Sequence, residues 1–329
     1  MKVTNSFIKT VFKVSVAITL IFFLARMIDW RESWKIARSL DSLYLFLYMA
    51  FLILGIAISA KKWEILGKFC GYTFPFSSYF RWYLAGTFVN NFLPSVIGGD
   101  TFRAMALGKL HKSRAHAISG IIFDRYIGLV SLAILGIFFS LWNISLVVEN
   151  PLWLFLFSGA VFGVVAQFLI LPGKKWSLFP LIFRFLPKKI TKIAESIEEF
   201  KDTRLTTISF LLGILFSFIG VGVANYILFT AVGISFSFID FLSIIFFINI
   251  ISAFPLSINN IGVKEWAYYI FFGYFGIAPE ISVTVAIISR FLQMGLSLWA
   301  IPTVLTFRRE RKKDEAEEEN DEKENTDER

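Results

Sequence analysis

The sequence predicts an all-α integral membrane protein with six full transmembrane helices and two broken, re-entrant helical hairpins, arranged as two inverted repeats. The first observation is composition: 56% of the 329 residues are hydrophobic and only 18% are charged, whereas about a quarter of the residues of a soluble domain are charged. The second is a run, residues 205–251, whose only charged residue is Asp240. The third is a pair of apolar segments that proline and glycine interrupt. Lipid is the natural solvent for such a chain.

Apolar stretches of about 20 residues have the length that a helix needs to cross a bilayer. They place full crossings at residues 7–28, 42–60, 117–142, 152–171, 206–231 and 282–306. The first run follows basic residues but continues to Ile28 without a small-residue cleavage site, so a retained span fits better than a secretory signal. The membrane domain is therefore expected to cover residues 1–306, and residues 307–329 are expected to form a charged, disordered cytoplasmic tail.

Two further apolar segments, residues 83–110 and 241–276, are interrupted near the middle. The expected helix-breaking residues are Asn90, Asn91, Pro94, Gly98 and Gly99 in the first segment and Pro255, Asn259, Asn260 and Gly262 in the second. Proline removes a backbone donor and glycine loosens the backbone, so each segment is predicted to form two half-helices joined by an irregular turn. Ordinary spans kinked at the prolines are the alternative. The charge beside both breaks favours re-entrant hairpins, whose irregular backbone must be shielded or line a wet cavity.

The order of elements repeats. Residues 7–142 give span, span, broken hairpin and span, and residues 152–306 give the same order, so three crossings per half invert the second half. If both hairpins are re-entrant and the N-terminus is cytoplasmic, the segments on the cytoplasmic side hold 23 basic residues. The connectors on the outer side hold only Arg31, Lys35 and Arg38. This bias predicts cytoplasmic N- and C-termini. Paired broken helices in inverted halves indicate a transport site near the midplane.

Charge and composition exclude several kinds of partner and site. The net charge of +8 hides two opposed parts. Residues 307–329 hold 7 basic and 11 acidic residues, and residues 1–306 hold 26 basic and 14 acidic residues. Basic loops of a membrane protein contact anionic lipid, so no nucleic-acid partner is expected. The single cysteine, Cys70, and the two histidines, His111 and His116, provide neither an internal disulfide nor a zinc site. Gly98-Gly99 lacks the spacing of a phosphate-binding loop. We expect no metal and no cofactor.

Seven charged residues lie in or beside the predicted apolar layer, where an unpaired charge costs several kcal/mol. These candidate substrate-binding residues are Asp100, Arg103, Asp124, Arg125, Lys264, Glu265 and Arg290. In one interpretation, Asp100 with Arg103, and Asp124 with Arg125 across neighbouring helices, form internal ion pairs that only hold the bundle together. In the other, the charges line a polar cavity with a slight positive excess that receives an anionic headgroup, since arginine presents a planar fork of donors to phosphate.

Three motifs follow one another in the chain: Asn91 to Arg103 with Pro94 and Gly98-Gly99-Asp100, then Asp124-Arg125, then Pro255 to Glu265 with Gly262-Val263-Lys264. In this order they resemble the transmembrane region of the lysylphosphatidylglycerol synthase family, also described as a flippase-like domain. The likeness covers nearly all of residues 5–306. Asn259-Asn260 stand where the family usually has glycines, and Lys264 stands where it usually has an arginine. A point charge in place of a fork suits a different headgroup.

The resemblance implies lipid translocation in the cytoplasmic membrane of a prokaryote. The family's best-understood members carry a soluble aminoacylating domain, whereas only hydrophilic residues follow Phe307 here, so a stand-alone flippase-like region is expected. Its partners would be membrane lipids with an anionic headgroup: an anionic or aminoacylated phospholipid, or a polyprenyl-phosphate-linked lipid. Whether the protein forms a homodimer is a question that the sequence leaves open.

The alternative is a membrane-embedded transferase that uses a polyprenyl-phosphate donor, with Asp100, Asp124 and Glu265 as acid, base or metal ligands. Against it, the sequence has no Asp-x-Asp motif and no soluble nucleotide-binding region. A non-catalytic scaffold would leave the buried charges unexplained.

Overall fold

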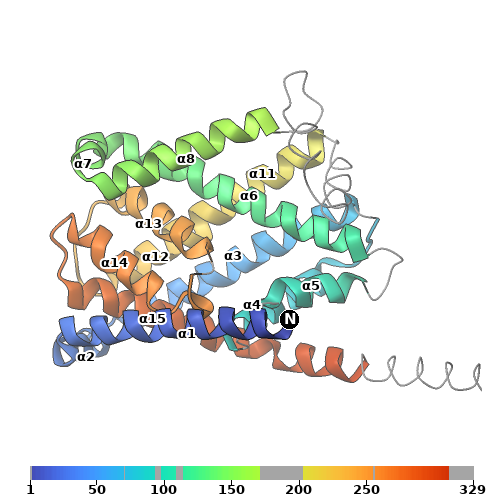
Figure 1. Ribbon diagram of the computed structural model, residues 1–329, viewed down its shortest axis with the longest axis horizontal. Helices are drawn as coiled ribbons and strands as arrows, with labels where there is room; N and C mark the ends of the chain where they lie inside the picture. The colour runs from blue at the N-terminus through green and yellow to red at the C-terminus, as the bar shows by residue number, and fades with distance from the viewer. Residues whose placement is uncertain are drawn as a thin grey trace, which may run out of the picture.

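The structure is a computed structural model that describes residues 2–69, 71–92, 98–108, 114–170, 203–254 and 256–310, in which every regular element is helical. Figure 1 shows the helices as one elongated bundle. The first half contains α1 (Lys2–Met27), α2 (Trp30–Arg38), α3 (Ser42–Phe69), α4 (Phe76–Phe92), α5 (Gly98–Gly108), α6 (Arg114–Ser140) and α7 (Ile144–Glu149). The second contains α8 (Pro151–Ile170), α11 (Thr203–Phe216), a π-helical turn (Ser217–Val223), α12 (Ala224–Thr230), α13 (Phe238–Ala253), α14 (Val263–Gly273) and α15 (Pro279–Ser297).

Helix length and composition confirm a multi-pass membrane protein. Four stretches of the described residues are long and apolar enough to cross a membrane: Ser42–Lys68, Ala117–Glu149, Arg204–Thr230 and Pro279–Glu310. They coincide with four of the six predicted crossings. The other two fall in α1 and α8, whose apolar parts, Val14–Met27 and Pro151–Ala166, are shorter.

The last helical stretch runs past the predicted end of the membrane domain. It continues to Glu310, and Phe307 is buried with its ring centroid 4.8 Å from that of Phe102 in α5. Phe307 therefore packs with the membrane domain, although it was expected to begin the tail. Residues 311–329 lie outside the described part of the chain.

The first interrupted segment folds back on itself. Arg103 in α5 lies over the ring of Tyr83 in α4, with 4.6 Å between the guanidinium carbon and the ring centroid. Nearer the break, Gly86 and Gly99 are so close that a methyl group on Gly99 would overlap the Gly86 carbonyl. Positions rise along one helix as they fall along the other, so α5 returns beside α4. Pro94, with residues 93–97, lies outside the described residues.

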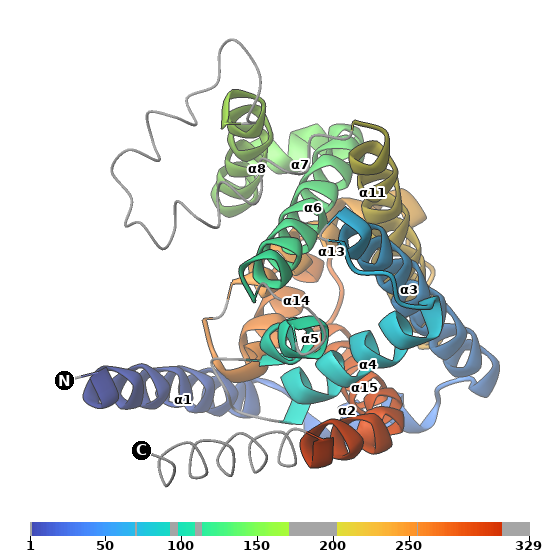
Figure 2. The ribbon, with the colours of Figure 1, turned by 90° about the vertical axis from the view of Figure 1, so that its right-hand side faces the viewer.

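The second interrupted segment also folds back, and it occupies the interior of the bundle. Phe241–Ile248 of α13 are all buried, and the end-on view of Figure 2 places α13 and α14 between α6, α3 and α15. The rings of Phe241 and Phe272 lie 5.5 Å apart, and the Asn260 side-chain amide donates to the Ser252 carbonyl. With 16 residues, α13 is about 24 Å long at 1.5 Å per residue, which is less than the hydrocarbon thickness. Pro255 lies outside the described residues.

The two halves interlock. Helix α6 of the first half packs against α13 of the second, and α15 of the second half packs against α4 of the first. Helix α3 runs beside α11, the π-helical turn and α12. These pairings place each interrupted segment against the last long helix of the other half.

Two glycines allow a close approach of α3 to the π-helical turn. A methyl group added to Gly55 would lie 2.9 Å from the Cα atom of Gly220, in the π-helical turn. Small residues at such crossings let backbones approach and pack without a hydrophobic driving force. The contact between α3 and the second half therefore depends on Gly55 and Gly220 having no side chains.

This packing predicts opposite effects for two glycine-to-alanine substitutions. In a helix interior, alanine is intrinsically more favourable than glycine by about 1 kcal/mol, so Gly159→Ala in α8, where no described atom lies within 4 Å of the added methyl group, should leave the melting temperature in detergent unchanged or raise it. Gly55→Ala should lower it despite that gain, because overpacking costs about 1–3 kcal/mol. An unchanged or raised melting temperature for Gly55→Ala would show that α3 has room to move.

Candidate functional site

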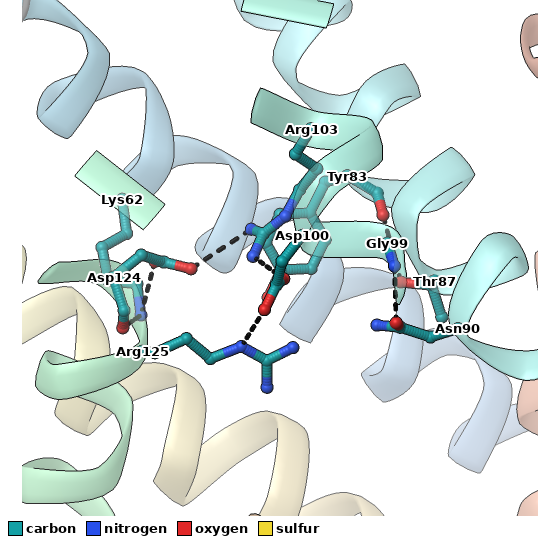
Figure 3. A network of polar contacts seen from close by, with 9 residues as sticks. All are labelled: Lys62, Tyr83, Thr87, Asn90, Gly99, Asp100, Arg103, Asp124 and Arg125. Atoms are coloured by element: carbon teal, nitrogen blue, oxygen red, sulfur yellow. Dashed lines mark hydrogen bonds and ion pairs between the residues drawn. The ribbon is translucent and has the colours of Figure 1, made fainter. Parts of the chain in front are cut away.

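Four predicted site residues meet where α5 faces α6, as Figure 3 shows. Arg103 lies 2.6 Å from Asp100 (Nη2 to Oδ1) and 3.2 Å from Asp124 (Nη1 to Oδ2). The Nε atom of Arg125 lies 2.7 Å from Oδ2 of Asp100. The expected pair of Asp100 with Arg103 is present. Asp124 and Arg125 form their ion pairs across neighbouring helices, Asp124 with Arg103 and Arg125 with Asp100, and not with each other, because adjacent residues on a helix do not face each other.

Lys62 in α3 is a fifth member of this network that sequence reasoning missed. Its side chain is only 3% exposed, and its Nζ atom lies 2.9 Å from Oδ1 of Asp124. It was counted among the cytoplasmic loop charges because it follows the apolar run of α3. A local signal was available: Glu64 pairs with Lys61 at i,i+3 and with Lys68 at i,i+4, which leaves Lys62 without a partner on its own helix.

The network carries an excess of one positive charge, with three basic and two acidic side chains, and it borders a cavity of about 160 Å³. Arg103 is 5% exposed and lies over the rings of both Trp63 and Tyr83. The cavity wall includes all five charged residues together with Tyr83, Gly86, Thr87, Asn90 and Ala253. Low dielectric inside such a bundle strengthens the attraction of an anion to the excess charge.

Arg125 differs from the other members of the network. Its side chain is 58% exposed, and its one ion pair within the described residues uses Nε, so the two terminal nitrogens point away from Asp100 (Figure 3). These nitrogens form the half of the guanidinium fork that binds phosphate or carboxylate oxygens in a bidentate manner. Arg125 is therefore the group best placed to meet an anionic ligand.

Two asparagines stabilise the first break. The side-chain Oδ1 of Asn90 accepts a hydrogen bond from the backbone N–H of Gly99 at 2.6 Å, which satisfies one of the donors that a helix start leaves free. Asn91 donates to the hydroxyl of Ser297 in α15 at 3.2 Å. The predicted helix-breaking residues thus also attach the first hairpin to the second half.

At the second break, Arg290 of α15 binds freed backbone carbonyls. Its Nη1 atom donates to the carbonyl of Asn259 at 2.8 Å, and its Nη2 atom donates to that of Asn260 at 3.2 Å. Its Nε atom donates to Glu265 at 2.9 Å, whose other carboxylate oxygen accepts from the N–H of Gly262 at 2.7 Å. Arg290 and Glu265 together satisfy backbone groups that the interruption exposes.

Backbone geometry explains which residue types can occupy the turn at the second break. Asn259 and Asn260 have φ angles of 48° and 52°, and Gly262 has a φ angle of 84°. Glycine adopts such angles at no steric cost, and asparagine is among the few other residues that tolerate them. The break therefore forms its left-handed turn with asparagine at two of its positions.

Lys264 is a cation whose contacts within the described residues are neutral. Its Nζ atom donates to the hydroxyl of Ser289 at 2.9 Å and lies 5.7 Å from the ring centroid of Tyr268. The Tyr268 hydroxyl in turn donates to Asn225 at 3.2 Å. The neighbouring Glu265 is already paired with Arg290, so among the described residues no carboxylate forms an ion pair with Lys264.

The structure thus divides the predicted site residues into two groups, one beside each break. The first group gains Lys62, and the second consists of Lys264, Glu265 and Arg290. Ala253, the last residue of α13, lines the first cavity, so that cavity extends toward the second break.

The comparison with known families agrees with this architecture. The model of the lysylphosphatidylglycerol synthase TM region matches residues 10–300. The chain belongs to this family. A UPF0104 membrane protein of Methanocaldococcus jannaschii is 25% identical over 320 residues, which cover 88% of this chain and 91% of the relative. A UPF0104 membrane protein of Methanothermobacter thermautotrophicus is 25% identical over 294 residues, covering 80% and 84%. This member of the family thus has prokaryotic relatives of similar extent.

The contacts of Arg290 predict a large loss of stability on its removal. Arg290→Gln would leave Glu265 buried without its ion-pair partner, and removing one partner of a buried pair costs about 3–5 kcal/mol. Lys61→Gln is the matched control, because Lys61 is 49% exposed and Glu64 keeps Lys68; exposed pairs contribute about 0–1 kcal/mol. Melting temperatures in detergent should fall steeply for Arg290→Gln and hardly for Lys61→Gln. Equal melting temperatures for the two variants would show that the contacts of Arg290 do not stabilise the fold.

Proposed function

We propose that this protein is a lipid flippase that moves a lipid with an anionic headgroup between the two leaflets. The observation that carries the proposal is the position of Arg125, a partly free guanidinium fork within a membrane helix, beside a charged cavity. Ionisable residues inside membrane proteins are costly and usually mark a pathway for a substrate or ion. The positive excess of the network favours a negatively charged cargo.

The proposed membrane layout has six crossings and two re-entrant hairpins in two inverted repeats, with both termini cytoplasmic. The lengths of the half-helices support it: α4 and α5 have 17 and 11 residues, and α13 and α14 have 16 and 11. The reciprocal packing of α6 on α13 and of α15 on α4 is the arrangement that two related halves would produce. The charge bias of the sequence sets the orientation.

The cargo that we propose is an anionic or aminoacylated phospholipid or a polyprenyl-phosphate-linked lipid, all of which present a phosphate. Arg125 and Lys264 would contact it directly, because each keeps donor capacity that no carboxylate of the described residues uses. The other five predicted site residues, Asp100, Arg103, Asp124, Glu265 and Arg290, would hold the two breaks and orient these cations. One cation beside each break would give the headgroup two successive sites.

The transferase alternative receives less support from the contacts. Its candidate acids and bases are Asp100, Asp124 and Glu265. Each of these carboxylates forms an ion pair with a lysine or an arginine. None of them is therefore presented to the cavity as an unpaired carboxylate. A new lipid product formed from a polyprenyl-phosphate donor by the purified protein would favour this alternative.

The proposed orientation predicts a labelling pattern for single cysteines in a variant without Cys70. Cysteines at the exposed positions Ser39 and Ser235 should react with a membrane-impermeant maleimide in sealed cells, and one at the exposed position Thr73 should react only after permeabilisation. Thr73 lies between α3 and α4, on the side with most basic residues. Reaction at Thr73 in sealed cells would overturn the layout.

Removal of the Arg125 guanidinium should lower the rate of lipid transport without destabilising the protein. In Arg125→Gln, Asp100 keeps its ion pair with Arg103, so the melting temperature should stay close to that of the wild type. A lost hydrogen bond to a charged group is worth about 1.5–3 kcal/mol, which corresponds to a roughly 10- to 100-fold slower translocation. Dithionite quenching of fluorescent phosphatidylglycerol in proteoliposomes measures the rate.

Lys61→Gln serves again as the control, since it removes an exposed cation that lies outside the cavity. It should translocate the lipid at the wild-type rate. Wild-type translocation by Arg125→Gln, or none by the unmodified protein with any lipid of the proposed classes, would refute the proposal.

A further inference from the structure

A groove shares two of its lining residues, Asp100 and Arg125, with the charge network. It has a volume of about 300 Å³, and α5 and α6 form its walls. The lining residues are Asp100, Thr101, Ala104, Ile118, Ile121, Ile122 and Arg125. Asp100 and Arg125 also line the cavity of about 160 Å³. The Asp100–Arg125 ion pair therefore stands between the groove and the inner cavity.

One wall of the groove is an amphiphilic stripe on α6. Ile118, Ile121, Ile122 and Arg125 are spaced i, i+3, i+4 and i+7, which places them on one helix face. The stripe is about 10 Å long at 1.5 Å per residue. Ile118 and Ile122 are each 41% exposed. The facing wall, on α5, has small side chains at Thr101 and Ala104, which leave space between the helices.

We propose that this groove docks a membrane phospholipid, with its phosphate on the terminal nitrogens of Arg125 and one acyl chain along the three isoleucines. The inference deepens the proposed flippase function, on which it rests, by naming the lateral entrance. Charge and shape both fit this occupant, because a single cation ends an apolar stripe. A free phosphate ion would use the arginine but would leave the exposed Ile118 and Ile122 uncovered.

The ion pairs allow the phosphate to exchange with Asp100 at little cost. Arg125 is one of two arginines on Asp100, and Arg103 remains bound when Arg125 turns away. A buried carboxylate left without any partner would cost several kcal/mol. The shared carboxylate avoids that cost, so Arg125 can bind the phosphate in the groove and carry it toward the cavity that it also lines.

The order of the stripe differs from the order of phosphate and chains in a lipid at rest in the cytoplasmic leaflet. With α6 entering from the cytoplasmic side, the isoleucines lie nearer the cytoplasmic surface than Arg125. A lipid at rest in the cytoplasmic leaflet has its phosphate at the surface and its chains deeper. The groove places phosphate and chain in the reverse order, as expected for a lipid whose headgroup has left its own surface.

Photo-crosslinking tests the groove without measuring transport. The full chain carries benzoylphenylalanine in place of Ile122, in nanodiscs of phosphatidylcholine with a minority of phosphatidylglycerol, and adducts are identified by mass spectrometry after irradiation. Phosphatidylglycerol adducts should exceed that lipid's share of the disc several-fold. The control position is Phe138 on the same helix, which is 50% exposed and lies outside the groove; its adducts should follow the disc composition.

Two variants with the probe at position 122 complete the test. Arg125→Gln should return the adducts to the composition of the disc, and Ala104→Phe, which fills the facing wall, should reduce all lipid adducts there. Adducts in proportion to composition in the parent, or enrichment that survives Arg125→Gln, would overturn the docking site. Enrichment in a protein that translocates no lipid would contradict the flippase proposal alone, and translocation without enrichment would contradict the groove alone.

Discussion

Lipid offers no hydrogen bonds to an interrupted helix, and this constraint explains most of the polar chemistry inside the bundle. Each of the two helix breaks is stable because side chains, in place of water, form hydrogen bonds with the backbone N–H and C=O groups that the break leaves unpaired. Asn90 accepts from the N–H of Gly99 at the first break, while Arg290 and Glu265 bind two carbonyls and one N–H at the second. The charges beside the breaks are thus first a condition of the fold, and only the donors that remain after this role are available to a ligand.

Helix α15 joins the two hairpins through one polar stripe. Arg290 holds the second break, Gln293 donates to the hydroxyl of Tyr48 in α3 at 3.1 Å, and Ser297 accepts from Asn91 at the first break. The spacing of i, i+3 and i+7 places these three side chains on one face. A displacement of either hairpin would therefore strain contacts on the same helix face, so the hairpins are coupled mechanically even though they belong to different halves.

Local patterns in the sequence predicted the four long apolar helices and one ion pair beside the first break. Apolar length marked α3 and α6, and the i,i+3 spacing of Asp100 and Arg103 marked an ion pair. The contact of Lys62 with Asp124 joins residues 62 positions apart, which no periodicity encodes, and a lysine at the end of an apolar run resembles any loop charge. The capping role of Arg290 was equally hidden, because it depends on where a broken backbone directs its carbonyls.

Arg290 also has a consequence for the ionic requirements of the protein. Unwound carbonyls at the middle of known transporters commonly coordinate a sodium ion, and the carbonyls of Asn259 and Asn260 likewise lie at an interruption between two helices. Here the guanidinium occupies them, with Glu265 as its counter-ion. The chain thus supplies its own tethered cation at this position, so both carbonyls already have a positively charged partner that belongs to the protein.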